Sequence, residues 1–187
     1  ALLLLVVHAS QVAAQVPSGY ISSDRITGHY LNSDDRSAVV LIHGWTNQTL
    51  QNPPVFQDPF GGDEWHQLIE ALYTRLNGTG TRLILFHWED DASTGHAIDN
   101  VYNLLGLFQV GFSHATSAAG NAFSNGDRLA EQLDRVARDL RRVTFIAHSA
   151  GAWAAYRAAD KLLQANPYVV VNVVLLDPFI PGADQSR

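Results

Sequence analysis

A serine lies at the centre of the pentapeptide Ala-His-Ser-Ala-Gly, residues 147–151, between an apolar run and an alanine-rich segment. A serine on a tight strand-to-helix turn is suited to acyl transfer, because the turn exposes Oγ and directs the next N–H toward the reaction centre. Such a turn needs small residues two positions before and after the serine, and Ala147 and Gly151 meet this need. The pattern predicts that Ser149 is a nucleophile and that the N–H of Ala150 stabilises an oxyanion. The alternative is that Ser149 caps the following helix.

A second motif is Leu-Ile-His-Gly-Trp, residues 41–45, at the end of an earlier apolar run. Gly44 allows the backbone to turn, so that the N–H of Trp45 can face the same oxyanion. We expect His43 to fix this loop through hydrogen bonds rather than to act as a base. The alternative is an ordinary turn at the end of a strand.

The third motif is Leu-Leu-Asp-Pro-Phe, residues 175–179. An aspartate at the end of a buried strand can orient a catalytic imidazole and stabilise its protonated form. Asp177 could equally form a turn ahead of Pro178. Since Ser149 ends the preceding strand, we prefer the catalytic role for Asp177.

These motifs follow apolar, β-branched runs that are typical of strands buried on both faces. Four such runs occur, at residues 37–43, 81–88, 142–148 and 168–177. Four strands of this kind predict a parallel sheet.

Three segments between or after these runs have apolar residues at helical spacing, residues 65–76, 129–140 and 152–163. Asp127 is expected in the N-cap region of the second helix. Strands that alternate with helices predict an α/β fold with a mostly parallel sheet and helices on both faces.

Two long connections do not fit simple crossovers. Residues 46–64 are rich in proline and glycine, and residues 89–126 include apolar positions at helical spacing between 101 and 112. Both follow strand ends, where open α/β sheets place their ligand sites. We expect them to form the walls or lid of a pocket.

The composition of the 187-residue chain narrows the class of protein. A net charge of -6 and the lack of any long basic run argue against a nucleic-acid partner. The chain has no cysteine, which excludes disulfides, thiolate metal sites and a cysteine nucleophile. The sequence contains no His-Glu-x-x-His motif and no comparable ligand cluster, so it does not indicate metal-dependent hydrolysis.

The N-terminal residues 1–14 are interpreted as part of a secretory signal. A short apolar run leads into small residues at positions 12–14, at the spacing that signal peptidase accepts. The run is too short to span a bilayer, so no transmembrane anchor is expected. An N-terminal strand is the alternative, and His8 within the apolar stretch favours it. The interpretation predicts a secreted or periplasmic protein whose folded domain covers residues 15–187.

The three motifs, in this order, resemble the α/β-hydrolase superfamily and more narrowly the lipases of the pancreatic-lipase type. In that group a His-Gly-aromatic oxyanion loop, a serine elbow and an Asp in a Leu-Asp-Pro turn recur in the same order. The resemblance covers about residues 37–178, although Ala147 replaces the first glycine of the usual elbow. It implies that Ser149 is the nucleophile, Asp177 the acid, and Trp45 and Ala150 the oxyanion donors.

The catalytic histidine is missing from the expected place. In this fold the chain order is Ser, then Asp, then His, yet all eight histidines precede Ser149. The simplest interpretation is a chain truncated at both ends, which lacks its last strands and its histidine. The alternative is that His96 or His114, in the long connection at residues 89–126, acts as the base, although both are expected to be surface residues. His148 is expected to point away from the nucleophile.

We therefore expect a serine-dependent hydrolase of carboxylic esters, acting on lipids and without a cofactor. Contact with a lipid interface is a further expectation, from the apolar stretch in residues 101–112. The alternatives are a non-catalytic binding protein of the same fold and an inactive fragment.

Overall fold

The computed structural model describes residues 20–23, 34–45, 59–88, 92 and 107–180, with the backbone alone for 20–23 and 107–116. Residues 1–14, which the sequence analysis interprets as part of a secretory signal, lie outside the described residues. The same holds for most of the connection expected at 46–64 and for much of the one at 89–126.

The described chain forms a five-stranded sheet in the order β1-β3-β2-β4-β5. Its strands are β1 (Tyr20–Ser23), β2 (Ser37–Ile42), β3 (Thr81–His87), β4 (Arg142–His148) and β5 (Val170–Leu176). The last four are mutually parallel, and β1 pairs antiparallel with β3 at one edge. The predicted parallel sheet is confirmed with its four strands, while β1 was not predicted.

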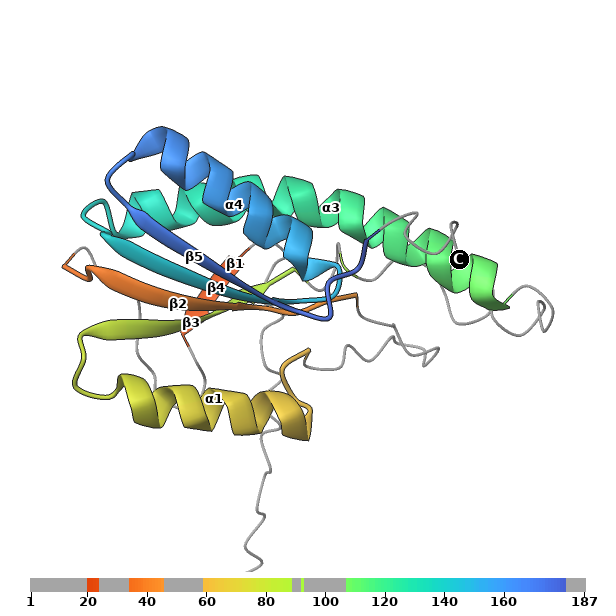
Figure 1. The fold of residues 1–187 in the computed structure, drawn as a ribbon, viewed down its shortest axis with the longest axis horizontal. Coiled ribbons are helices and arrows are strands. Elements are labelled where there is room, and N and C mark those ends of the chain that lie inside the picture. The colour runs from red at the N-terminus through yellow and green to blue at the C-terminus, as the bar shows by residue number, and fades with distance from the viewer. Residues whose placement is uncertain (1–19, 24–33, 46–58, 89–91, 93–106, 181–187) are drawn as a thin grey trace, which may run out of the picture.

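Helices cover both faces of the sheet, as the sequence predicted. One face carries α1 (Asp63–Leu76), and the other carries α3 (Leu107–Val136) and α4 (Gly151–Ala165). Figure 1 shows α1 on one side of the strands and the α3–α4 pair on the other. Burial from both sides explains why β2 reads as a nearly continuous apolar run: all its residues but the first are buried.

The second helix differs from its prediction at both ends. It begins at Leu107, so Asp127 lies within α3 and does not cap it, and it ends at Val136. Gly126 lies within the helix at the point where α3 approaches α4. A Cβ there would lie 2.6 Å from the Ala154 carbonyl oxygen, so the close approach needs glycine. Asp127 instead pairs with α4, where its Oδ1 lies 2.8 Å from Nε of Arg157.

The C-terminal edge strand β5 is covered much less than its neighbours. Successive β4 residues alternate between the α4 face, where Val143 and Phe145 are buried, and the α1 face, where Ile146 is partly buried. α1 packs on the residues of β2 and β3, so no described element covers the α1 face of β5. As a result, six of the seven β5 residues are exposed.

Candidate active site

The three motifs meet at one edge of the sheet. β2, β4 and β5 run parallel, with Ile42 in register with Ala147 and His148 in register with Leu176. The residues that follow these strands must therefore lie side by side. This carboxyl edge is where open α/β sheets bind their ligands.

Ser149 occupies a strained turn between β4 and α4. Its φ is +50°, a left-handed conformation that is uncommon outside glycine. Its backbone N–H donates to the Leu176 carbonyl oxygen at 3.1 Å, which ties the turn to the end of β5. The N-cap of α4 is Ala150, and no side chain caps the helix, so Ser149 is not a capping residue. Backbone strain of this kind is typical of functional sites.

Gly44 lies directly against this turn. A Cβ on Gly44 would sit 2.8 Å from the Ser149 Cβ and 3.1 Å from the His148 carbonyl oxygen. Both distances are shorter than ordinary contacts, so only glycine lets the loop after β2 approach the serine this closely.

Gly151 allows a second close approach between the same two segments. Its Cβ would collide with the His43 carbonyl oxygen and lie 2.9 Å from Cγ2 of Ile42. The start of α4 therefore packs on the end of β2 with no room for a side chain. Both small residues are needed by the geometry around Ser149.

The buried ring of His43 holds the loop after β2 in place. Its Nδ1 lies 2.8 Å from the Gly44 carbonyl oxygen, and the backbone N–H of Trp88 points at its Nε2 at 3.4 Å. Since Nε2 accepts, Nδ1 carries the proton and donates to Gly44. Nδ1 is thus engaged within the loop and Nε2 by the residue that follows β3, which leaves neither nitrogen available to Ser149.

Trp88 supports this arrangement and was missed by the sequence reasoning. Its indole Nε1 donates to the His43 carbonyl oxygen at 3.0 Å, and its ring stacks on the imidazole at a centroid distance of 5.3 Å. Phe60 closes the other side, edge-on to the same imidazole at 5.4 Å. A buried tryptophan needs an acceptor for its N–H, and this was the one signal that could have linked Trp88 to a neighbouring loop.

The backbone N–H of Ala150 is a candidate oxyanion donor. Ala150 is fully buried, and none of the described residues accepts a hydrogen bond from its N–H. It precedes the first turn of α4, where donors have no partner within the helix and the helix dipole favours negative charge. The second expected donor, Trp45, follows Gly44 and packs partly buried against the core.

Asp177 follows β5 directly, so it lies beside the serine turn that Leu176 anchors. It too has a left-handed backbone, with φ +46°, and it is exposed. Within the described part of the chain no hydrogen bond or ion pair engages its carboxylate. The segment after it is fixed from α4, because Nε1 of Trp153 donates to the Phe179 carbonyl oxygen at 2.9 Å.

The described histidine side chains do not supply a base to Ser149. His148 is turned toward α1, where its ring meets Trp65 edge-on at 6.4 Å, while His66 is exposed on α1 and His87 is buried. None of the described residues forms a hydrogen bond with the Ser149 hydroxyl.

His114 lies in α3, in the part described by its backbone alone, and His96 lies outside the described residues, as do His8 and His29.

A pocket of about 380 Å³ lies next to His148, between α1 and the ends of β4 and β5. Its walls are mostly apolar, and it is lined by Glu64, Trp65, Leu68, His148 and Leu176. Because His148 and Leu176 directly precede Ser149 and Asp177, this pocket adjoins the candidate site.

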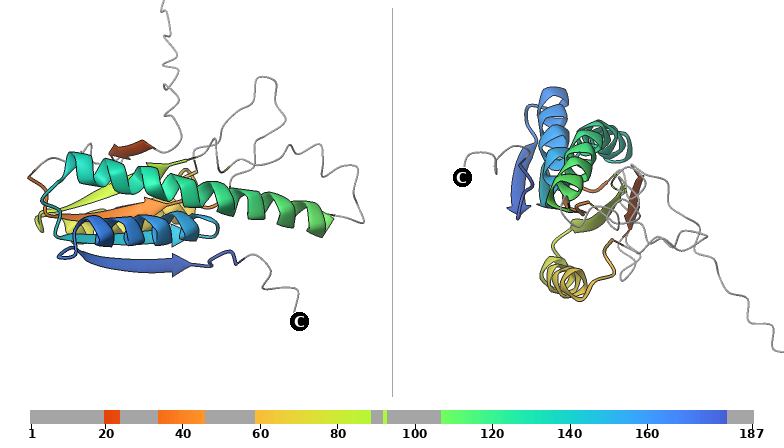
Figure 2. Two further views of the ribbon diagram at one scale, coloured as in Figure 1. Left: turned by 90° about the horizontal axis from the view of Figure 1, so that it is seen from above. Right: turned by 90° about the vertical axis from the view of Figure 1, so that its right-hand side faces the viewer.

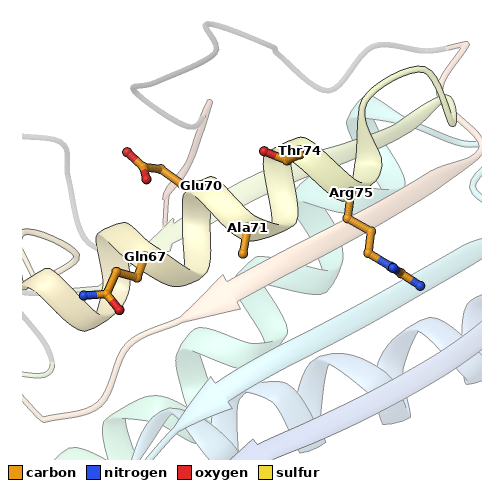
Figure 3. A pocket seen from close by; sticks show the side chains of 5 residues that line it. All are labelled: Gln67, Glu70, Ala71, Thr74 and Arg75. Atoms are coloured by element: carbon orange, nitrogen blue, oxygen red, sulfur yellow. The ribbon is translucent and has the colours of Figure 1, made fainter.

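A larger hollow, of about 800 Å³, lies elsewhere on the protein. All five residues that line it belong to α1: Gln67, Glu70, Ala71, Thr74 and Arg75. Figure 3 shows their side chains along this single helix. It contains none of the three motifs and is a depression on the surface of one helix, so it is not part of the candidate site.

The described residues contain no group of three or more His, Asp or Glu side chains that could hold a metal ion. None of the described helices is long and apolar enough to cross a membrane.

The fold defines the class as an α/β protein with a mostly parallel sheet. A family model described as "Alpha/beta hydrolase family" matches residues 39–187, and the chain belongs to that family. No curated protein and no solved structure matches it significantly. Family membership indicates a hydrolase acting on a small-molecule substrate.

Proposed function

We propose that the protein is a serine-dependent carboxylic ester hydrolase that works through an acyl-enzyme. The observation that carries this proposal is the left-handed turn at Ser149, where β4 passes into α4. A protein without a use for this turn would gain stability by placing glycine there, since the left-handed conformation costs an L-residue roughly 1–2 kcal/mol. A strained, partly buried serine at the ligand-binding edge of an α/β sheet supports the role of nucleophile.

In the proposed reaction Oγ of Ser149 attacks the ester carbonyl carbon, and its proton passes to a base. The negative charge moves onto the carbonyl oxygen, and the buried N–H of Ala150, with that of Trp45, stabilises it. The alcohol leaves with a proton from the same base. Water then attacks the acyl-enzyme, which releases the acid and restores Ser149.

Asp177 is the proposed acid of the triad. It ends the strand next to the one that carries Ser149, and the bond from the Ser149 N–H to the Leu176 carbonyl fixes their relative position. Its carboxylate is exposed, so an imidazole could reach it. The base itself comes from outside the described side chains: His96, His114 or a histidine in polypeptide beyond this chain.

An apolar acyl or alcohol group is the proposed substrate feature, as in lipases of the pancreatic-lipase type. The pocket beside His148 supports this, because Trp65, Leu68 and Leu176 supply most of its walls. Secretion, expected from residues 1–14, stays a prediction.

The test is hydrolysis of p-nitrophenyl esters with acyl chains of graded length by the complete natural protein. We expect Ser149→Ala to lower kcat by about 10⁶-fold, and Asp177→Asn by about 10⁴-fold. Ser124→Ala and Asp134→Asn are matched controls, since both residues are exposed on α3, and they should leave the rate unchanged. Unchanged hydrolysis by the Ser149→Ala variant would contradict the proposal.

A non-catalytic binding protein of the same fold is the second candidate. The observation that favours it is the lack of a hydrogen bond between Ser149 and any described histidine. It predicts no ester hydrolysis by the complete natural protein and no effect of either the His96→Ala or the His114→Ala substitution. Loss of activity in one of these two variants would instead identify the base.

A further inference from the structure

The turn after β5 holds Asp177 in a strained conformation. The residue has a left-handed backbone, with φ +46°, and Pro178 follows it directly. A residue before proline prefers an extended backbone, and the left-handed region is sterically disfavoured for any L-residue with a side chain. Such a conformation persists only where the surrounding structure fixes it. The contacts of this turn therefore decide where the Asp177 carboxylate lies.

Two hydrogen bonds fix the turn, and both come from the chain around the start of α4. The backbone N–H of Ser149 donates to the Leu176 carbonyl oxygen at 3.1 Å. The indole Nε1 of Trp153 donates to the Phe179 carbonyl oxygen at 2.9 Å. These two carbonyl groups lie before and after Asp177 in the chain. The two bonds thus hold both ends of the segment that contains the proposed acid.

Trp153 is itself well anchored within the first turn of α4. Its backbone N–H donates to the Ala150 carbonyl oxygen at 3.2 Å, and its partly buried ring packs against the core. Figure 2 shows β5 running alongside α4, so the first turn of the helix lies beside the segment that follows the strand. The indole therefore ties the turn that carries Asp177 to the helix that follows the nucleophile.

We infer that Trp153 is a positioning residue for the Asp177 carboxylate, an inference that rests on the proposed function. Trp153 acts through the turn: its bond to Phe179 keeps Asp177 in the left-handed conformation that the turn requires. Without this bond, the backbone of Asp177 relaxes toward the extended conformation that Pro178 favours. The carboxylate then moves away from the imidazole that it orients in the proposed triad.

A purely structural role for the same bond has different consequences. A partly buried indole needs an acceptor for its N–H, so the bond also contributes to stability. Loss of stability alone changes the amount of folded enzyme, but not the pH dependence of the folded molecules. Misplacement of the carboxylate lowers the pKa of the imidazole, because a nearby negative charge stabilises the protonated form. The base acts in its neutral form, so the rise of kcat/KM with pH then occurs at lower pH.

The experiment is the Trp153→Phe substitution in the complete natural protein, which keeps an aromatic ring and removes the N–H donor. Hydrolysis of a p-nitrophenyl ester is measured over a range of pH. We expect kcat to fall by about 10²-fold, the effect of a small misplacement, against about 10⁴-fold for Asp177→Asn. KM should stay unchanged, and the rise of kcat/KM should move to lower pH.

A double substitution tests whether Trp153 acts through Asp177. If it does, adding Trp153→Phe to Asp177→Asn should change kcat by less than about twofold, because the carboxylate is already lost. Tyr156→Phe is the matched control, since Tyr156 lies one turn further along α4 and is 62% exposed. It should leave kcat, KM and the pH dependence unchanged. Circular dichroism melts give the folded fraction of each variant at the assay temperature.

The possible failures are distinguishable. A folded wild-type protein that hydrolyses no ester would overturn the proposed function and this inference with it. Hydrolysis that responds to Asp177→Asn but keeps its kcat and its pH dependence in Trp153→Phe would overturn the inference alone. So would a further loss of about 10²-fold when Trp153→Phe is added to Asp177→Asn, since Trp153 would then act independently of the carboxylate.

Discussion

Replacing Gly151 with alanine would place a methyl group where α4 begins against the end of β2. The new Cβ would lie 2.9 Å from Cγ2 of Ile42 and 3.1 Å from its carbonyl oxygen, and closer still to the carbonyl oxygen of His43. Carbon atoms in good contact are about 3.5–4.0 Å apart. Two of the three neighbours are backbone atoms, so the helix or the loop has to move.

The expected cost follows from these contacts. Overpacking of this kind costs about 1–3 kcal/mol, while alanine regains about 0.5–1 kcal/mol over glycine in a helix. We expect the free energy of unfolding to fall by about 1–2 kcal/mol, which lowers Tm by about 2–4 °C per kcal/mol in a chain of this size. Ester hydrolysis should fall as well, since the His43 loop would be displaced from Ser149.

Gly120→Ala is the matched control, because Gly120 lies within α3 and a Cβ there would meet no atom within 4 Å. That change should raise the free energy of unfolding by about 0.5–1 kcal/mol. Thermal melts followed by circular dichroism compare the two variants. If Gly151→Ala melts at or above the temperature of Gly120→Ala, the close approach of α4 to β2 is refuted.

Three other substitutions test separate parts of the site and its scaffold. Ser149→Gly should be more stable than Ser149→Ala by about 0.5–1 kcal/mol in chemical denaturation, because glycine relieves the left-handed strain; equal or lower stability would contradict the conformation. Trp88→Phe removes the hydrogen bond to the His43 carbonyl oxygen and should lower the free energy of unfolding by about 1–3 kcal/mol, with slower ester hydrolysis. An unchanged free energy of unfolding would show that Trp88 does not hold the loop. Asp127→Asn weakens the bond to Arg157 and should lower stability by about 1 kcal/mol with hydrolysis unchanged; a loss of hydrolysis at full stability would argue against a purely structural role.

The sequence predicted the sheet well, because burial on both faces makes the central strands read as continuous apolar runs. β2, β3 and β4 have this pattern, and β5 has it although it is exposed. β1 was missed because four residues, two of them serine, carry little periodicity.

The boundaries of α3 could not be predicted from local signals. Gly126 and Asp127 look like the start of a helix, yet they are where α3 crosses α4. Leu140 belongs to the apolar stripe and is buried, but it lies in a turn after the helix has ended. The spacing of apolar residues alone does not show where α3 begins and ends, since packing between distant segments determines both ends.

The candidate site was predictable in its residues but not in its supports. The order of the three motifs and the parallel sheet together imply that Gly44, Ser149 and Asp177 follow adjacent strands. The contacts between His43 and Trp88 join positions 45 residues apart and depend on the folded backbone.

The most direct measurement is covalent labelling of the complete natural protein with a fluorophosphonate, followed by mass spectrometry of its peptides. The proposed mechanism predicts one phosphonyl adduct, on Ser149, which Ser149→Ala abolishes and the folded Ser124→Ala control retains. An adduct on another residue, or none on a folded protein, would contradict the assignment of Ser149 as the nucleophile.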